Sequence, residues 1–277
     1  SMTVRDALLR GKRRPRNLGS GSPTTYRGDG YEFVELRAYV PGDDVRRIDW
    51  AASARSGDMQ TRVVLEDVAL TLAAIVDDSP SMRVGRKRPL LDAAYEAAEG
   101  WLLCAKGEDR CMHVTGDFVT PAALQRKPHA VFAELQQKGA TRFDAGRAMV
   151  TARAALPRGT ALLAIGDWWE LDASHDRLLA QLGARYDCTA LIARDPWYDG
   201  LPLAGMVRMR GAEGGHVRAY IGKREREAYR SAVRKREAAL LERFAAANWR
   251  TGLLFEEDGF ASIAGAFGLH SGEARVR

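Results

Sequence analysis

From residue 68 onward, the apolar and polar positions alternate between strand-like runs and helix-like spacing. Residues 68–77 form a continuous apolar run, which is typical of a central parallel strand buried on both faces. Residues 89–106 instead place apolar side chains at helical spacing. The remaining segments are expected to form strands at 110–115, 118–121, 160–166, 186–193 and 249–255, and helices at 128–137, 145–155, 173–182 and 259–267. This order predicts an α/β fold with a doubly wound, mostly parallel sheet flanked by helices on both faces.

Further elements extend this predicted core at both ends. Residues 205–222 are expected to form a β-hairpin with its turn at 211–215, and 223–247 a long helix whose apolar stripe is interrupted by Arg236 and Glu237. At the amino-terminal side, we expect a flexible basic tail and then a tightly turned segment packed on the core. The predicted domains are 1–27 for the tail, 28–67 for the packed segment and 68–277 for the α/β domain, with a hairpin and long-helix insertion at about 205–247.

Composition is that of an ordinary globular protein. The chain has 277 residues, 46% of them hydrophobic, and its apolar runs are shorter than the roughly 18 residues that span a membrane. The amino-terminal residues do not have the apolar stretch of a signal peptide. Cys104, Cys111 and Cys188 form no C-x-x-C pair and are expected to be buried thiols. These features predict a cytoplasmic protein.

The net charge of +6 leaves nucleic-acid binding open as one function. The basic residues are spread along the chain, and the clearest basic cluster is at 10–16, within the predicted tail. A mobile, solvated terminus is the structural alternative for this cluster. Nucleic-acid binding would therefore depend on the tail.

Five polar side chains suggest a divalent-cation site. Asp77, Ser79 and Ser81 follow the apolar run 68–77, Thr141 lies in a turn that opens a helix, and Asp167 ends the run 160–166. The carboxyl ends of strands in an open α/β sheet are where such folds place their sites. Carboxylates and hydroxyls are hard ligands that suit Mg²⁺ or Mn²⁺, with Ca²⁺ also possible. The alternative is that the two serines only cap the next helix, although that helix begins near residue 89, which makes capping poor.

These five residues occur in the order of a metal-ion-dependent adhesion site, so the chain resembles a von Willebrand factor A domain, a Rossmann-like fold. The resemblance implies direct ligation of the cation by Ser79, Ser81 and Thr141. Asp77 and Asp167 would ligate it directly or through water. It also implies one open coordination position, which an Asp or Glu of a client protein could fill.

The segment 28–55 extends this resemblance. It contains Leu-Arg-x-Tyr, Gly-Asp, Ile-Asp-Trp and Ala-Arg in one order, and in this respect resembles the DUF58 family, in which such a segment precedes a von Willebrand A-like domain. The Asp-Pro and Leu-Pro pairs at 195–202 are also similar, except that Tyr198 stands where a carboxylate is common. The charged and aromatic residues of the segment are expected to form either a salt-bridged, partly buried buckle that ties the segment to the sheet, or a conformational latch or docking surface near the metal. They are Arg37, Asp43, Arg46, Asp49, Trp50 and Arg55.

The family resemblance implies a partner. Proteins of this family resemble partners of MoxR-type AAA+ ATPases. Together with these ATPases, they are expected to act in the maturation or assembly of other protein complexes. Trp168 and Trp169 directly follow Asp167, and Trp197 and Tyr198 lie on a neighbouring loop, so these four aromatics are the candidate partner-binding residues. Core packing is the alternative for each.

The sequence does not point to an enzyme. It has no P-loop, no His-Glu-x-x-His motif and no convincing Ser-His-acid arrangement. A Mg²⁺-dependent phosphoesterase that uses Asp77 as nucleophile or ligand is the enzymatic alternative. The leading hypothesis is a metal-dependent protein-interaction module.

Overall fold

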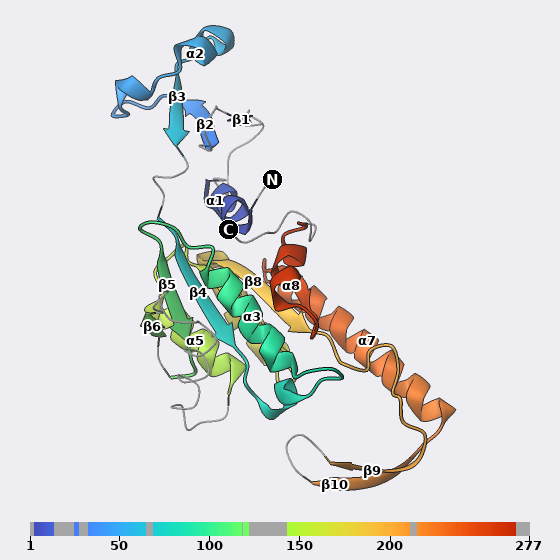
Figure 1. Cartoon of the computed structure of the whole chain (residues 1–277). Helices are drawn as coiled ribbons and strands as arrows, with labels where there is room; N and C mark the ends of the chain where they lie inside the picture. Colours follow the sequence, from blue (N-terminus) through green and yellow to red (C-terminus); the bar gives the residue numbers. More distant parts are fainter. Residues whose placement is uncertain are drawn as a thin grey trace. The chain divides into compact units, whose positions relative to one another are not determined.

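The larger of two compact units is built on a six-stranded sheet. The computed structural model describes residues 3–13, 25–27, 33–64, 69–117, 119–121, 143–210 and 215–269. The larger unit comprises Ser1–Leu8 with Leu70–Arg277, and the smaller unit comprises Leu9–Ala69. The sheet order is β11-β8-β7-β4-β5-β6, and its strands are β4 (Thr71–Val76), β5 (Arg110–Val114), β6 (Val119–Pro121), β7 (Ala161–Gly166), β8 (Asp187–Ala193) and β11 (Arg250–Leu254) (Figure 1).

All neighbouring strands in this sheet are parallel except β5 and β6. If the six strands are renumbered 1 to 6 in chain order, starting with β4, the order across the sheet from the β6 edge is 3-2-1-4-5-6. This is the doubly wound order. The order reverses between β4 and β7, and ligands of open α/β sheets bind outside the carboxyl ends of the strands at this switch point. The predicted fold class is therefore confirmed, and it draws attention to the residues that follow β4 and β7.

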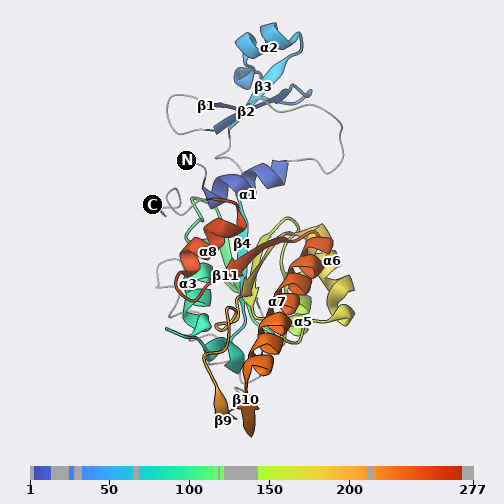
Figure 2. The ribbon, with the colours of Figure 1, turned by 90° about the vertical axis from the view of Figure 1, so that its right-hand side faces the viewer.

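Helices cover both faces of the sheet (Figure 2). On one face lie α3 (Leu90–Leu102) and α8 (Gly259–Ala266), and on the other lie α5 (Ala145–Ala155), α6 (Asp176–Arg185) and α7 (Lys223–Ala246). The α3–α8 contact is close, because a Cβ on Gly259 would lie 1.9 Å from the carbonyl oxygen of Ala93. The opposite core packs Met149, Leu179 and Phe244 against apolar side chains of the sheet. Both faces are thus apolar, which explains the continuous hydrophobic runs of the central strands.

The predicted elements of the larger unit agree with the structure to within a few residues at their ends. The exception is the helix expected at 173–182, where a short 3-10 turn (Ala173–His175) precedes α6. The side chain of Asp172 accepts a hydrogen bond from Ser174 N at 2.9 Å, which stabilises this turn before the α-helix begins. The helix expected at 128–137 lies outside the described residues.

The hairpin and the long helix are also present. The hairpin consists of β9 (Gly205–Arg210) and β10 (His216–Ile221), and α7 follows it directly. Glu237, which interrupts the apolar stripe of α7, is buried and forms two hydrogen bonds with the guanidinium of Arg194, at 2.7 and 3.0 Å. A buried charge must be paired, and this ion pair ties α7 to the end of β8.

The smaller unit contains an antiparallel three-stranded sheet, in the order β1 (Thr25–Arg27), β2 (Phe33–Ala38), β3 (Gln60–Val64). Between β2 and β3 lie a 3-10 turn, η1 (Val45–Arg47), and a short helix, α2 (Trp50–Ser56). The segment that was expected to pack on the core thus belongs to a compact unit of its own.

The amino-terminal residues differ from the expected flexible tail. Residues Val4–Arg13 form a helix, α1, in which Leu8 and Leu9 are buried. Within the larger unit, Arg5 pairs with Asp109 at 2.9 Å, and Asp109 also accepts a hydrogen bond from the backbone N of Leu70 at 2.7 Å. No helix among the described residues has the length and hydropathy required to cross a membrane.

Candidate metal centre

Asp77 and Asp167 lie side by side at the switch point of the sheet. Asp77 directly follows β4 and Asp167 directly follows β7, and these two strands are parallel neighbours. The backbone N of Asp77 donates a hydrogen bond to the carbonyl oxygen of Ile165 at 2.8 Å, which extends the pairing to the site. Both aspartates are almost fully buried, with 4% and 6% of their surface exposed. The tertiary structure therefore brings together two carboxylates that are 90 positions apart in the sequence.

Ser79 and Ser81 complete the described part of the cluster. Oδ1 of Asp77 accepts a hydrogen bond from Ser79 N at 2.9 Å, and the hydroxyls of Ser79 and Ser81 are 3.1 Å apart. The hydroxyl of Ser81 also hydrogen-bonds Asp167. Ser81 therefore connects the loop after β4 to the carboxylate after β7.

Helix capping does not explain the two serines. Ser79 precedes a short 3-10 turn, η3 (Pro80–Arg83), but its side chain makes no capping hydrogen bond there. Helix α3 begins after Pro89, whose side chain cannot accept a hydrogen bond. Both hydroxyls are thus available to the aspartates, and the alternative that they cap a helix is wrong.

The two carboxyl groups hold protons more tightly than ordinary aspartates do. Burial raises the pKa of Asp77, and the neighbouring charge of Asp167 raises it further. Burial also raises the pKa of Asp167, although its hydrogen bond from Ser81 acts in the opposite direction. Two buried carboxylates repel each other, and a bound divalent cation would remove both the repulsion and the need for a proton.

Gly166 makes room for this pair. A Cβ on Gly166 would lie 2.8 Å from the Cβ of Asp77 and 3.0 Å from its Oδ2, which is closer than unbonded atoms normally approach. The last residue of β7 must therefore be glycine if Asp77 is to occupy its position. Sequence reasoning missed this residue, although a glycine directly before a strand-end aspartate was a usable signal.

The donor set fits a hard divalent cation. Two carboxylates and two hydroxyls supply only oxygen ligands, which suit Mg²⁺, Mn²⁺ or Ca²⁺. Among the described residues, no group of three or more His, Cys, Asp or Glu side chains is arranged to hold a metal ion. A cation at this site would therefore need the hydroxyls as well as Asp77 and Asp167. Thr141, the predicted fifth ligand, lies outside the described residues.

Trp168 and Trp169 point to different environments. Trp168 has a left-handed backbone (φ 57°) and is 2% exposed. Its ring packs edge-on against that of Phe244, with 5.4 Å between the ring centres, and its Nε1 donates a hydrogen bond to Leu191 O at 3.3 Å. Its predicted role in partner binding is therefore wrong, because the turn at this residue directs the indole into the core. Trp169 is 61% exposed and remains accessible beside Asp167.

Helix α7 supplies a cation beside Trp169 that sequence reasoning did not identify. The guanidinium of Arg236 donates a hydrogen bond to the carbonyl oxygen of Asp167 and lies 4.0 Å from the centre of the Trp169 ring. The sequence showed Arg236 only as an interruption of an apolar stripe. Such an interruption in an otherwise amphipathic helix was the signal that could have found it.

The loop with Trp197 and Tyr198 is held against α7. Both residues are half-buried, and Trp197 N donates a hydrogen bond to Oδ1 of Asp195 at 2.8 Å. The carboxylate of Asp195 in turn accepts a hydrogen bond from the hydroxyl of Tyr229. The ring of Tyr198 lies 4.0 Å from the guanidinium carbon of Arg194. These contacts order the loop at the carboxyl end of β8, the same end of the sheet as Asp77.

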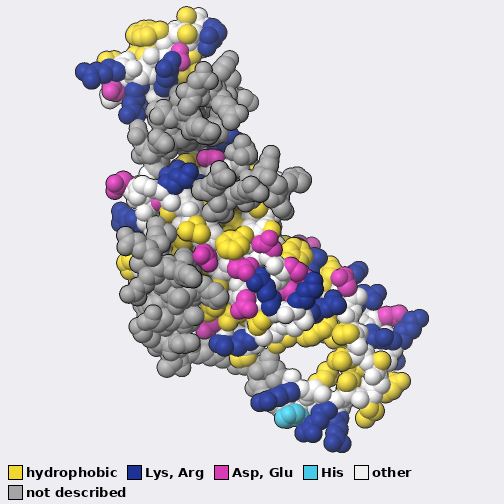
Figure 3. Space-filling view, in the orientation of Figure 1, with side chains coloured by type: hydrophobic (Ala, Val, Ile, Leu, Met, Phe, Trp, Pro, Cys, Tyr) yellow, Lys and Arg dark blue, Asp and Glu magenta, His cyan; other side chains and the backbone are white. Residues whose placement is uncertain are grey.

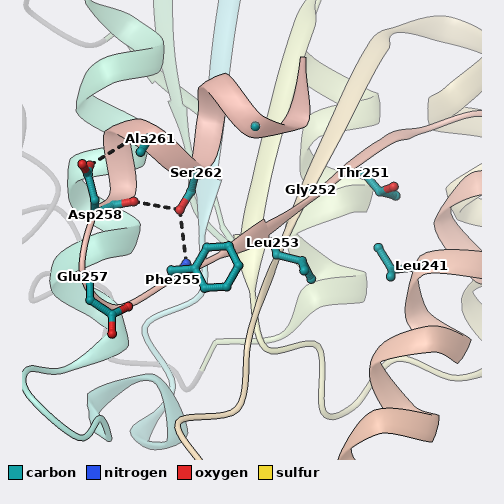
Figure 4. A pocket seen from close by; sticks show the side chains of 10 residues that line it. Leu241, Thr251, Gly252, Leu253, Phe255, Glu257, Asp258, Ala261 and Ser262 are labelled. Atoms are coloured by element: carbon teal, nitrogen blue, oxygen red, sulfur yellow. Dashed lines mark hydrogen bonds between the residues drawn. The ribbon is translucent and has the colours of Figure 1, made fainter. Parts of the chain in front are cut away.

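A separate hollow of about 630 Å³ lies along β11, between α7 and α8 (Figure 4). Ser262 and Asp258, two of its polar residues, are hydrogen-bonded locally: Ser262 Oγ donates to the carbonyl oxygen of Asp258 at 2.8 Å and accepts from Phe255 N at 3.1 Å. Asp258 Oδ1 accepts from Ala261 N at 3.0 Å, which caps α8. The hollow thus has no converging set of ligands like that at Asp77.

Residues 35–239 match the family described as "Protein of unknown function DUF58". The chain belongs to the DUF58 family. It is 32% identical over 206 residues to the uncharacterized protein Mb1516 of Mycobacterium bovis and to the uncharacterized protein Rv1480 of Mycobacterium tuberculosis. Each alignment covers 70% of this chain and 64% of the relative, so the matched region is less than two thirds of these relatives' own length.

Two solved structures are distantly similar to this DUF58 protein. They are BatB from Bacteroides thetaiotaomicron, which covers 63% of this chain and 100% of its own, and an aerotolerance-related membrane protein from Bacteroides fragilis, with 65% and 99%. Both have 14% identity and a TM-score of 0.35. The assignment of the fold therefore rests on the strand order of this chain.

The DUF58 segment residues form local contacts within the smaller unit. Arg37 pairs with Asp43 at 2.6 Å, and Asp49 pairs with Arg62 at 2.9 Å. Asp49 also accepts a hydrogen bond from Ala52 N at 2.9 Å and so caps α2. These pairs join residues within this unit, and their arginine side chains are 44% and 56% exposed, whereas the expected buckle was partly buried and tied the segment to the sheet.

Three further residues of the segment are exposed. Arg46 and Arg55 lie on the surface, and Trp50, at the start of α2, is 68% exposed. The buried residue of α2 is Ala52, and the indole of Trp50 lies on the surface.

Proposed function

We propose that this DUF58 protein is a divalent-cation-dependent protein-interaction module. The observation that supports it is the buried pair Asp77–Asp167, with the Ser79 and Ser81 hydroxyls beside it, at the switch point of the sheet. A bound cation would supply positive charge and a coordination position for an outside ligand. Asp77, Asp167 and the two serines would hold it, and Thr141 is the proposed fifth ligand.

The partner side of the proposal rests on anionic recognition. An Asp or Glu of a client protein would complete the cation's coordination, and the exposed ring of Trp169 would provide apolar contact next to it. The guanidinium of Arg236, stacked on that ring, adds positive charge at the same place. Tyr198 and the half-buried Trp197 are the candidates for extending this surface.

The resemblance described above suggests a MoxR-type AAA+ ATPase as the partner, and the maturation or assembly of other protein complexes as the process. The proposed module is not itself an enzyme. A cation-dependent complex between the purified ATPase and this chain, absent with Asp77→Ala, would support this part. Equal binding in chelator and in Mg²⁺ would contradict it.

The decisive test of the site is calorimetric titration of Mg²⁺ and Mn²⁺ into the metal-stripped protein. We expect binding to the wild type and none to Asp77→Ala. Asp199→Ala removes an exposed carboxylate from the loop after β8 and is the matched control, which should bind like the wild type. Because Asp77→Ala also removes the acceptor of the hydrogen bond from Ser79 N, the melting temperature of each variant is measured alongside, which separates lost binding from unfolding.

The same variants test the phosphoesterase alternative. Hydrolysis of a generic phosphate ester that requires Mg²⁺ and disappears in Asp77→Ala would favour an enzyme over an interaction module. We expect no such activity from a module whose cation serves only to bind a partner's carboxylate. Nucleic-acid binding through the basic residues at 10–16 would instead fall steeply with salt and be lost on their removal.

A further inference from the structure

The β9–β10 hairpin exposes both of its faces. Among the described residues, its two strands pair only with each other. Met206, Val217 and Tyr220 are 74%, 60% and 65% exposed, whereas Ile221 at the base is 5% exposed. A two-stranded ribbon is only marginally stable without support, so a ribbon with this much exposed apolar surface is unusual unless it binds something.

One face of the hairpin is basic. Strand register and side-chain alternation place six residues on this face, all of them exposed: Met206, Arg208, Arg210, His216, Arg218 and Tyr220. Neither strand contains an acidic residue. Figure 3 shows the basic and hydrophobic side chains gathered at this end of the unit. We call this set the hairpin face.

Two like charges face each other across the strands. Arg208 lies directly opposite Arg218. Like charges in directly opposed positions destabilise an antiparallel pair. This opposed arginine pair is an observation independent of the exposed apolar residues. An acidic group bound between the two arginines would convert their repulsion into attraction.

We propose that the hairpin face binds an acidic, partly apolar segment of a partner protein. Arg, Tyr and Met are enriched in protein interfaces and Lys is depleted, and the two strands contain no lysine. The free strand edges could pair with an extended segment. A nucleic acid would match the arginines but would offer no apolar surface to the exposed side chain of Met206 on the same face.

The hairpin lies at the same end of the sheet as the cation site. The chain leaves the carboxyl end of β8, passes through residues 194–204 and enters β9 (Figure 1). Strands β4, β7 and β8 are parallel, so Asp77 and Asp167 are at this end as well. One partner could therefore contact both the hairpin face and the cation site. Binding to the hairpin face does not itself require the cation.

The test uses the full chain and three labelled probes, measured by fluorescence anisotropy and vesicle co-sedimentation. The probes are a peptide of alternating glutamate and leucine, a short DNA duplex, and phosphatidylcholine vesicles containing phosphatidylserine. The hairpin variant is Arg208→Glu/Arg218→Glu. The control is Arg158→Glu/Arg177→Glu, which makes the same change of charge at exposed sites elsewhere in the unit.

We expect the wild type and the control to bind the peptide equally, and the hairpin variant to bind at least about tenfold more weakly. Met206→Ser/Tyr220→Ser keeps every charge and should also weaken binding, which separates recognition from simple charge attraction. Peptide binding by the hairpin variant at the wild-type level would overturn the proposal. So would tighter binding of the duplex or of the vesicles than of the peptide.

The proposal of a cation site at Asp77 is tested separately from the proposal about the hairpin face. Every peptide titration is repeated in chelator, where the effect of the hairpin variant should persist. Mn²⁺ binding to the hairpin variant should equal that of the wild type. Loss of Mn²⁺ binding in Asp77→Ala tests the site at Asp77 and says nothing about the hairpin face.

Discussion

Gly166 and Asp77 are in contact across neighbouring strands, and a methyl group on Gly166 would lie 2.8 Å from the Cβ of Asp77. Gly166 ends β7 and Asp77 directly follows the parallel neighbour β4, so the side chain of Asp77 has room only because Gly166 has none. This relationship gives a direct way to disturb the candidate metal centre without removing a ligand.

Gly166→Ala should lower the affinity for Mn²⁺ at least about tenfold, because Asp77 must shift from its present position. Overpacking should also lower the free energy of unfolding by about 1 to 3 kcal/mol. The matched control is Gly265→Ala in α8, where an added Cβ meets nothing within 4 Å, and which should bind Mn²⁺ normally. Calorimetry and urea denaturation measure the two effects. Normal Mn²⁺ affinity in Gly166→Ala would contradict the proposed ligand geometry.

Cation affinity should rise with pH. Burial and mutual repulsion raise the pKa of both Asp77 and Asp167 above that of an ordinary aspartate, so at mildly acidic pH a proton competes with the cation. Titrations of Mn²⁺ at several pH values should show progressively tighter binding as the pH increases through the raised pKa. Proton release on binding, seen as a dependence of the heat on the buffer, is the second readout. Affinity independent of pH over this range would mean that the pair is already fully ionised.

The adjacent tryptophans should behave differently. Trp168→Ala removes a buried ring that packs on Phe244 and should cost about 3 to 5 kcal/mol of stability. Trp169→Ala removes an exposed ring that contacts Arg236 and should cost less than about 1 kcal/mol. Only the second variant should reduce partner binding while leaving Mn²⁺ affinity unchanged. Thermal unfolding and partner titration separate the two outcomes.

The ion pair between Arg194 and Glu237 should be sensitive to the loss of one partner. Glu237→Ala leaves a partly buried guanidinium without its carboxylate, at a cost of about 2 to 3 kcal/mol. The double variant Arg194→Met/Glu237→Met should recover most of that loss, since an apolar pair carries no desolvation cost. Urea denaturation of both variants checks this. A double variant less stable than Glu237→Ala would show that the ion pair itself is net stabilising.

His113 should make stability depend on pH. Burial lowers the pKa of His113 to about 4, whereas the unfolded chain has a value near 6.5. Between about pH 6.5 and 4 the unfolded chain binds a proton that the folded protein does not, so stability falls as the pH decreases, by up to about 3 kcal/mol. His113→Gln should remove this contribution from the curve of unfolding free energy against pH. An unchanged slope in the variant would contradict the prediction.

The sequence by itself determined the elements and their order. Apolar runs such as 160–166 and the helical spacing of 145–155 predicted strands and helices with accurate boundaries, since burial on both faces requires continuous hydrophobic residues. The strand-end positions of Asp77 and Asp167 followed from the same pattern. Parallel strands place their carboxyl ends at one edge, so the approach of these two carboxylates was predictable.

Only the tertiary structure decided which way individual side chains point. The left-handed backbone at Trp168 sends this tryptophan into the core and leaves Trp169 exposed, whereas the sequence left core packing open for each of them. Arg236 and Glu237 looked like defects in an amphipathic helix until the carbonyl oxygen of Asp167 and the guanidinium of Arg194 were found beside them. Such pairings join residues far apart in sequence, and they are fixed by the packing of α7 on the sheet rather than by local propensity.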